Sequence, residues 1–179
     1  MVIILCGLPY SGKSTCAGAL ANLLGNSWRV KDLDNCIEKL YLEETGVTKT
    51  YREIFGDEGR EVFRMWETRA LSNISDNNII LSLGGGTLET PENRDMVKVL
   101  GQVVYLKCST DIVWNRLKDK KPKYLDPNNP YESFIKLVER RLPQYIEASH
   151  ITVDVTDLAI KEVGDKVLQE LRGKYKNVE

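Results

Sequence analysis

One segment near the amino terminus has the residue types and spacing that phosphate binding requires. Residues 7–14 read GLPYSGKS, which matches the pattern GxxxxGK[ST] at every fixed position. Gly7 and Gly12 allow the backbone to turn so that its N–H groups point at phosphate oxygens. Lys13 would bring a positive charge to the β- and γ-phosphates of a nucleotide, and the Ser14 hydroxyl could ligate Mg²⁺. The nucleotide-binding set predicted from this segment is Gly7, Tyr10, Ser11, Gly12, Lys13, Ser14 and Thr15.

Asp32 and Asp34 form a second candidate group, at the end of a candidate strand over residues 28–33. A carboxylate near the γ-phosphate can accept the proton of an attacking hydroxyl, or orient that hydroxyl. The same two residues could instead only cap the helix that follows, because Asp is a frequent N-cap residue. The sequence leaves both roles open.

Two further groups could contact a small molecule. Arg64 and Glu67 are three residues apart, so they share one face of a helix. A solvent-exposed ion pair, worth well under ~1 kcal/mol, is one interpretation of that spacing. Gly84, Gly85 and Gly86 follow a predicted strand, at the end where ligands bind in open α/β sheets. Without side chains their backbone could approach a ligand closely, and a flexible turn is the alternative.

The elements that must position these residues alternate along the chain. Strands are expected at residues 2–6, 28–33, 79–83, 103–106 and 151–155, the second of them near a sheet edge because it is less apolar. Helices are expected at residues 14–24, 35–44, 58–73, 91–100, 110–117 and 158–171. This alternation predicts an α/β fold with a five-stranded parallel sheet covered by helices on both faces. No linker divides the chain, so one domain is expected over residues 1–179.

Residues 119–130 interrupt the alternation. They contain three prolines and two asparagines, and a basic cluster is formed by Lys118, Lys120, Lys121 and Lys123. Most segments of this kind are plain surface loops. Their length and charge, in a protein that binds phosphate, favour a mobile lid at about residues 119–130.

The overall composition excludes several classes of protein. A formal charge of -1 and a pI near 6.0 argue against a large nucleic-acid or anionic-membrane surface. No apolar run approaches the roughly 20 residues that span a bilayer. The four cysteines have no paired spacing, which favours free thiols in a reducing compartment. We therefore expect a cytoplasmic protein, a monomer, with no nucleic-acid or membrane partner.

Several motifs now line up in a recognisable order. After the phosphate loop come DLD at residues 32–34, FRMWE at 63–67, GGG at 84–86 and RLPQY at 141–145. In this order they resemble the shikimate kinase family, from residue 1 to about residue 154. The phosphate loop is shared by many families, whereas the other four motifs are jointly specific. The resemblance implies a three-layer P-loop kinase fold.

The resemblance also implies roles for individual residues. Asp34 would orient and deprotonate the acceptor, and Asp32 would help to hold Mg²⁺ through water. Arg64 and Arg141 would grip the acceptor's carboxylate, which suits a planar guanidinium that can bond both oxygens. The implied acceptor-binding set is Asp34, Arg64, Glu67, Gly84, Gly85, Gly86 and Arg141.

The predicted lid departs from the family pattern. The family has an arginine followed by Pro-Leu-Leu, and its side chain reaches the phosphates when the lid closes. Here Lys121 stands beside Pro122, and Lys123 is the other candidate. Lysine keeps the charge but loses the bidentate fork. Arg116, on the preceding helix, resembles the family residue that packs on adenine.

The reaction implied is transfer of the γ-phosphoryl group of MgATP to the 3-hydroxyl of shikimate, in chorismate and aromatic amino-acid biosynthesis. Asp34, Lys13 and Lys121 would be the catalytic residues. Another small-metabolite kinase, such as a gluconate kinase, is the nearest alternative. A non-catalytic nucleotide-binding regulator on the same fold is a second, suggested by the altered lid. A GTPase switch is disfavoured because the sequence lacks the guanine-reading NKxD motif.

Overall fold

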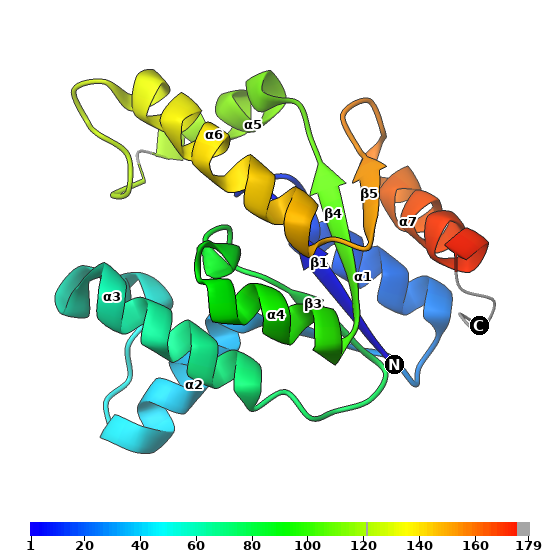
Figure 1. The fold of residues 1–179 in the computed structure, drawn as a ribbon, viewed down its shortest axis with the longest axis horizontal. Helices are drawn as coiled ribbons and strands as arrows, with labels where there is room; N and C mark the ends of the chain where they lie inside the picture. The colour runs from blue at the N-terminus through cyan, green and yellow to red at the C-terminus, as the bar shows by residue number, and fades with distance from the viewer. Residues whose placement is uncertain (121, 175–179) are drawn as a thin grey trace.

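The computed structural model describes residues 1–120 and 122–174, which form one parallel sheet flanked by helices (Figure 1). The strands are β1 (Val2–Cys6), β2 (Arg29–Asp32), β3 (Ile79–Ser82), β4 (Gln102–Lys107) and β5 (Ile151–Asp154). The helices are α1 (Lys13–Leu24), α2 (Leu33–Thr45), α3 (Tyr51–Ser72), α4 (Pro91–Leu100), α5 (Thr110–Leu117), α6 (Pro130–Ala148) and α7 (Ile160–Lys174), with short 3₁₀ turns η1 (Thr87–Glu89) and η2 (Lys118–Lys120). In the described part of the chain, no helix is long and apolar enough to cross a membrane.

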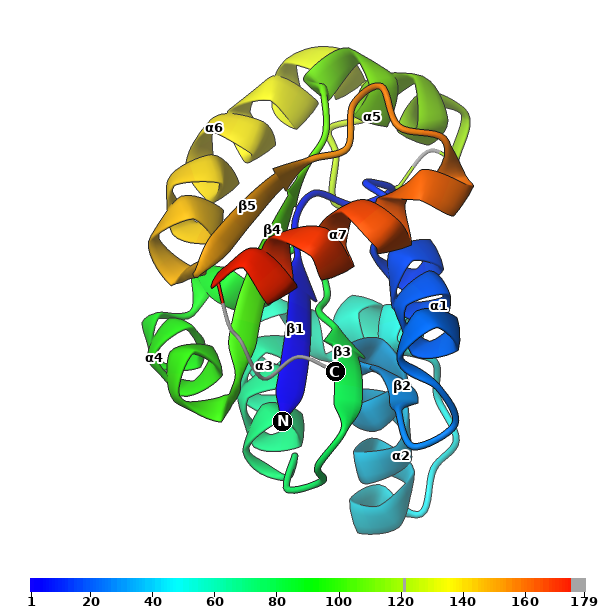
Figure 2. The same cartoon turned by 90° about the vertical axis from the view of Figure 1, so that its right-hand side faces the viewer.

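The sheet has the strand order β2-β3-β1-β4-β5, and neighbouring strands are parallel throughout. β1 and β3 are buried along their whole length, as expected for central strands with continuous apolar sequences. β2 lies at one edge with exposed or half-buried residues, as its less apolar sequence predicted. Figure 2 shows α1 and α7 on one side of the sheet and α4 and α6 on the other. The predicted five-stranded α/β architecture is therefore confirmed.

The strand register brings the carboxyl ends of three strands to one edge of the sheet. Asp32 at the end of β2 lies opposite Ser82 of β3, and Ser82 lies opposite Leu5 of β1. The phosphate loop therefore leaves the sheet close to both the start of α2 and the glycine segment after β3. Ligands bind at this edge in open α/β sheets.

The first three helices begin where local capping dictates. Gly12 precedes α1 with φ 98°, in the left-handed region that glycine adopts without strain. Asp32 caps α2 by accepting a hydrogen bond from the backbone N–H of Asp34. The third helix begins earlier than the expected residue 58, because Thr50 and Glu53 form a capping box. It is interrupted near its middle by a glycine with positive φ, so its hydrophobic period is not continuous.

Helix α6 was not among the expected elements. Its buried residues recur every three or four positions and are Phe134, Leu137, Arg141, Tyr145 and Ala148. Pro130 occupies the first turn, where proline is favoured, and a second proline inside the helix removes one backbone donor without ending it. Tyr145 stacks on Tyr105 of β4 with ring centroids 5.3 Å apart. This contact fixes the carboxyl half of α6 over the sheet.

The predicted lid segment connects η2 to α6. Leu125 in this segment is buried, with 7% of its surface exposed. Lys121 lies outside the described residues, and Lys123 is exposed. Movement of the segment stays a prediction.

Candidate active site

In the phosphate loop, the side chain of Lys13 binds the backbone of the loop itself. The Lys13 ammonium group is buried and donates hydrogen bonds to the carbonyl oxygens of Gly7, at 3.0 Å, and Leu8, at 2.8 Å. Burial lowers the pKa of Lys13 to about 8, and the negative charges of Asp34 and Asp32 oppose that shift. Ser11 Oγ is also buried and has no hydrogen-bond partner among the described residues. The loop thus presents a cation and an unpaired hydroxyl at the end of β1.

The structure brings Ser14 and Asp32 together, as the predicted metal site requires. Ser14 Oγ donates to Asp32 Oδ2 at 3.3 Å, while Asp32 Oδ1 accepts from the backbone N–H of Asp34 at 3.0 Å. Asp32 therefore caps α2 and faces Ser14 at the same time, so the two roles considered for it are compatible. The Asp34 side chain makes no hydrogen bond to the described residues. The interpretation that Asp34 only caps the helix is therefore wrong.

Asp34 lies among polar side chains beside the glycine segment. A Cβ atom on Gly84 would lie 3.0 Å from Asp34 Oδ1, 3.1 Å from Thr87 Oγ1 and 3.2 Å from Glu67 Oε1. Burial, together with the charges of Asp32 and Glu67, raises the pKa of Asp34 to about 7, and the charge of Lys13 opposes this shift. A carboxyl group with a pKa near neutrality is suited to exchanging a proton at physiological pH.

Arg64 and Glu67 do not form the solvent-exposed pair that their spacing allowed. Glu67 is only 1% exposed, and its carboxylate binds Nη1 of Arg64 and accepts a hydrogen bond from Thr87 Oγ1 at 2.7 Å. The remaining arginine predicted for the acceptor, Arg141 of α6, is also buried, with 7% of its surface exposed. The fold places both arginines against the glycine segment.

The glycine segment is where the two guanidinium groups meet. A Cβ on Gly86 would overlap Nη2 of Arg64 and would lie 2.8 Å from Nη2 of Arg141. A side chain at Gly86 would displace the ends of both arginines, which favours a close approach of the backbone over a plain flexible turn. Tyr145 donates a hydrogen bond to the carbonyl oxygen of Gly85, which ties the segment to α6.

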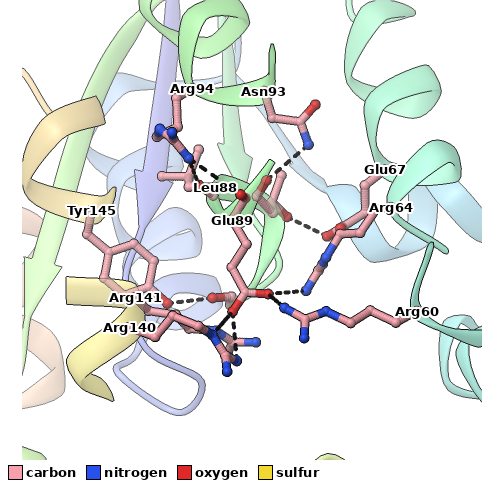
Figure 3. A network of polar contacts seen from close by, with 12 residues as sticks. Arg60, Arg64, Glu67, Leu88, Glu89, Asn93, Arg94, Arg140, Arg141 and Tyr145 are labelled. Carbon is pink, nitrogen blue, oxygen red and sulfur yellow. Dashed lines mark hydrogen bonds and ion pairs between the residues drawn. The ribbon is translucent and has the colours of Figure 1, made fainter. Parts of the chain in front are cut away.

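Glu89 is a functional candidate that the sequence reading missed. Its carboxylate, 8% exposed, is bound by four arginines from two helices, as Figure 3 shows. Burial opposes ionisation, but Arg141, Arg64 and Arg60 outweigh it and lower the pKa of Glu89 to about 2. A single acid after three glycines carries no motif, and its partner Arg141 is 52 residues away. Only the fold brings them together.

Arg116 contacts the phosphate loop directly, because its Nη1 donates to the carbonyl oxygen of Tyr10 at 3.0 Å. The side chain is otherwise exposed at the end of α5. Its predicted contact with adenine stays a prediction, as does the binding of ATP by Thr15. Lys121, predicted both as a catalytic residue and as an ATP ligand, lies outside the described residues.

The fold and the site define a class of protein. A phosphate loop joins β1 to α1, a carboxyl group of near-neutral pKa lies beside it, and a partly buried and a buried arginine lie at the same sheet edge. This is the arrangement of a P-loop kinase that phosphorylates a small molecule.

Comparison with known proteins identifies the family within that class. The family model described as shikimate kinase matches residues 9–172. The shikimate kinase of Bacillus cereus (strain G9842) is 32% identical over 169 residues, which cover 94% of this chain and 97% of that protein. The chain belongs to the shikimate kinase family, as its motifs predicted.

Solved structures agree with this assignment. A shikimate kinase from Acinetobacter baumannii in complex with shikimate has a TM-score of 0.85 and 32% identity, and the match covers 97% of this chain and 93% of that chain. A gluconokinase from Sinorhizobium meliloti 1021 has a TM-score of 0.62 but only 16% identity, with 99% of this chain and 94% of that chain covered. The second likeness shows the fold alone. The chain is therefore an ATP-dependent kinase of the shikimate kinase family.

Proposed function

We propose that the protein transfers the γ-phosphoryl group of ATP to the 3-hydroxyl of shikimate. The observation that carries the proposal is the meeting of two arginines, the partly buried Arg64 and the buried Arg141, at the bare backbone of Gly86. Two converging guanidinium groups suit one carboxylate, because each offers parallel N–H donors. Shikimate has one carboxylate and three hydroxyls on a ring, so an acceptor held by its carboxylate could present a hydroxyl to ATP.

The nucleotide would bind at the phosphate loop. Backbone N–H groups of residues 7–14 and the dipole of α1 favour the phosphates, and Lys13 would exchange its two carbonyl contacts for phosphate oxygens. Ser14 and Asp32 fit a bound Mg²⁺, since both offer the hard oxygen ligands that this ion prefers. When bound, Mg²⁺ would neutralise charge on the β- and γ-phosphates.

The chemical step needs a base beside the reacting hydroxyl, and Asp34 is placed for that role. The hydroxyl oxygen attacks the γ-phosphorus, the bond to the β–γ bridging oxygen breaks, and the hydroxyl proton passes to the Asp34 carboxylate. ADP leaves with the bridging oxygen, and the acceptor becomes a phosphate ester. Glu67 would act nearby by holding Arg64 and Thr87, and the backbone of Gly84 and Gly85 would face the ring hydroxyls.

The remaining parts of the proposal concern the lid and the state of the protein. A lid lysine, Lys121 or Lys123, would meet the phosphates when residues 119–130 close and exclude water. The cysteines Cys6, Cys16, Cys36 and Cys108 are free thiols, which supports a cytoplasmic location. We further propose that the chain acts as a single domain and a monomer, and light scattering of the purified protein would measure that.

A coupled ADP-release assay tests the function. Wild-type protein with MgATP should release ADP only when shikimate is added, and Asp34→Asn should lose about 10²-fold or more of that activity. Gluconate in place of shikimate tests the nearest rival, because a gluconate kinase would respond to it. If neither acceptor stimulates ADP release while ATP binds, the proposal fails at the acceptor, and only the P-loop fold and ATP binding are left of it.

A further inference from the structure

Glu89 has no role in the reaction described so far, yet it is the most highly coordinated charge in the site. Its Oε2 is bound by Arg60, at 2.8 Å, and Arg64, at 2.8 Å. Its Oε1 is bound by Arg140, at 2.9 Å, and Arg141, at 3.0 Å. Figure 3 shows the carboxylate between arginines that reach it from α3 on one side and α6 on the other.

The backbone that carries Glu89 is itself fixed. Asn93 donates to the carbonyl oxygen of Thr87 at 3.0 Å, and Arg94 donates to that of Leu88 at 2.9 Å. Arg94 in turn pairs with Glu147 of α6 at 3.2 Å. The η1 turn is therefore held from both α4 and α6, so the carboxylate has a defined position relative to the glycine segment.

The contacts leave N–H donors of both acceptor arginines available. Arg141 uses Nε for Glu89, while its Nη1 and Nη2 lie beside Gly85 and Gly86 and make no hydrogen bond to the described residues. Arg64 gives Nη1 to Glu67 and Nη2 to Glu89, and each of these nitrogens carries a second hydrogen. A ligand carboxylate at Gly86 could therefore bind both guanidinium groups without displacing Glu89.

Electrostatics supports the same arrangement. Two guanidinium groups that meet at one glycine repel each other in a buried site. A carboxylate shared between them, ionised at every pH near neutrality, offsets this repulsion and fixes the direction of both side chains. We propose that Glu89 is a positioning residue that holds Arg64 and Arg141 in the orientation needed to bind the acceptor's carboxylate. The inference rests on the proposed function, because it assumes an acceptor with that group.

Calorimetry with two ligands separates this role from a general structural one. The Kd of shikimate and of its uncharged methyl ester would be measured for wild-type, Glu89→Gln and Arg60→Gln proteins. Glu89→Gln should raise the Kd of shikimate about 10- to 50-fold and change the Kd of the ester less than about 2-fold. Steady-state kinetics should show the same loss in KM for shikimate, with KM for ATP unchanged and kcat lowered less than about 3-fold.

Arg60→Gln is the matched control. Arg60 binds the same carboxylate but is about half exposed, with a side-chain accessibility of 53%, and the nearest side-chain atoms to Gly86 belong to Arg64 and Arg141 instead. Its removal should change the Kd of shikimate less than about 3-fold. If Glu89→Gln fails to fold, Glu89→Asp carries the test, because it keeps the charge but shortens its reach; a rise of about 3- to 10-fold for shikimate alone is then expected.

Each other outcome overturns the inference. Equal weakening of shikimate and the ester would make Glu89 merely structural. Tighter binding of shikimate by Glu89→Gln would make Glu89 a competitor for the arginines, and an unchanged Kd would leave it without influence on them. Wild-type protein that does not bind shikimate would overturn the proposed function itself, and the inference with it.

Discussion

The phosphate end and the acceptor end of this site are built in different ways. The phosphate end comes from contiguous residues 7–14, and its cation, Lys13, donates hydrogen bonds to two carbonyl oxygens of the same loop. The acceptor end combines residues of α3, η1 and α6, and its cations, Arg64 and Arg141, form ion pairs with buried carboxylates. One end is a local structure and the other exists only in the folded chain.

Because of this difference, we expect substitutions at the two ends to affect different steps. A change at the phosphate loop should alter the rate and the use of ATP while leaving acceptor binding intact. A change in the arginine cluster should alter acceptor binding while leaving ATP binding intact.

The largest effect is expected at Lys13. Lys13→Met should lower kcat about 10³-fold, because a full positive charge is lost from the transferring phosphoryl group. The Kd of shikimate, measured by calorimetry without nucleotide, should change less than about 3-fold. Lys39→Met is the control, since Lys39 has a side-chain accessibility of 78% and lies on the outer face of α2. A large loss of shikimate affinity in Lys13→Met would contradict the separation.

A smaller effect is expected for the two adjacent arginines of α6. Arg141→Lys should raise KM for shikimate about 30-fold, because lysine retains charge but cannot bond two carboxylate oxygens in one plane. Arg140→Lys should raise it less than about 3-fold, since Arg140 is half exposed and contacts Glu89 from outside. Steady-state kinetics at saturating ATP would measure both. The reverse ranking would mean that the acceptor is bound by Arg140.

The contrast between the two ends also explains what the sequence could predict. The phosphate loop, the order of the strands along the chain and the glycine segment are local patterns, and all of them lie where the sequence placed them. The resemblance supplied Arg64 and Arg141, although nothing in their spacing predicts that they meet at Gly86. Glu89 has no local pattern, because its partners lie on helices distant in the chain.

Helix α6, which was not predicted, shows a different reason why local sequence can fail to predict an element. Its apolar period over Phe134, Leu137 and Tyr145 is regular, but an internal proline argues against a helix in any local reading. The helix persists because its buried face packs on β4 through Tyr145 and Tyr105. Tertiary packing thus overrides a local signal, at the helix that carries one of the two acceptor arginines.

The dependence of activity on pH would test the role of Asp34, which lies between the two ends of the site. Because the pKa of Asp34 is raised to about 7, its carboxyl is protonated and cannot act as a base at lower pH. The kcat/KM for shikimate should therefore fall below pH 7 and be about 10-fold lower at pH 6 than at its plateau. Glu67→Gln, which removes one of the charges that raise this pKa, should move the acid limb to lower pH. An acid limb that does not move would contradict the cause assigned to the shift.

The smallest effect concerns stability. Asp34 has a pKa of about 7 in the folded protein, against the ordinary pKa of 3.8 for an exposed aspartate, so folding favours its protonated form. Ionised Asp34 therefore destabilises the fold: the cost is absent at pH 4, grows as pH rises towards 7 and is fully present above it. Asp34→Asn should raise the free energy of unfolding by about 1 kcal/mol at pH 8 and by almost nothing at pH 4.

Urea unfolding of both proteins at the two pH values would measure this. Asp32→Ala is the control, because Asp32 caps α2 and alanine has no side-chain oxygen to replace that cap, so stability at pH 8 should fall. A stabilisation of Asp34→Asn that is equal at pH 4 and pH 8 would show that the charge of Asp34 is not its source. A stabilisation confined to high pH, together with lost activity, would mean that the ionised carboxylate of Asp34 is unfavourable for folding. The protein would then keep it between the phosphate end and the acceptor end of the site because the reaction needs it there.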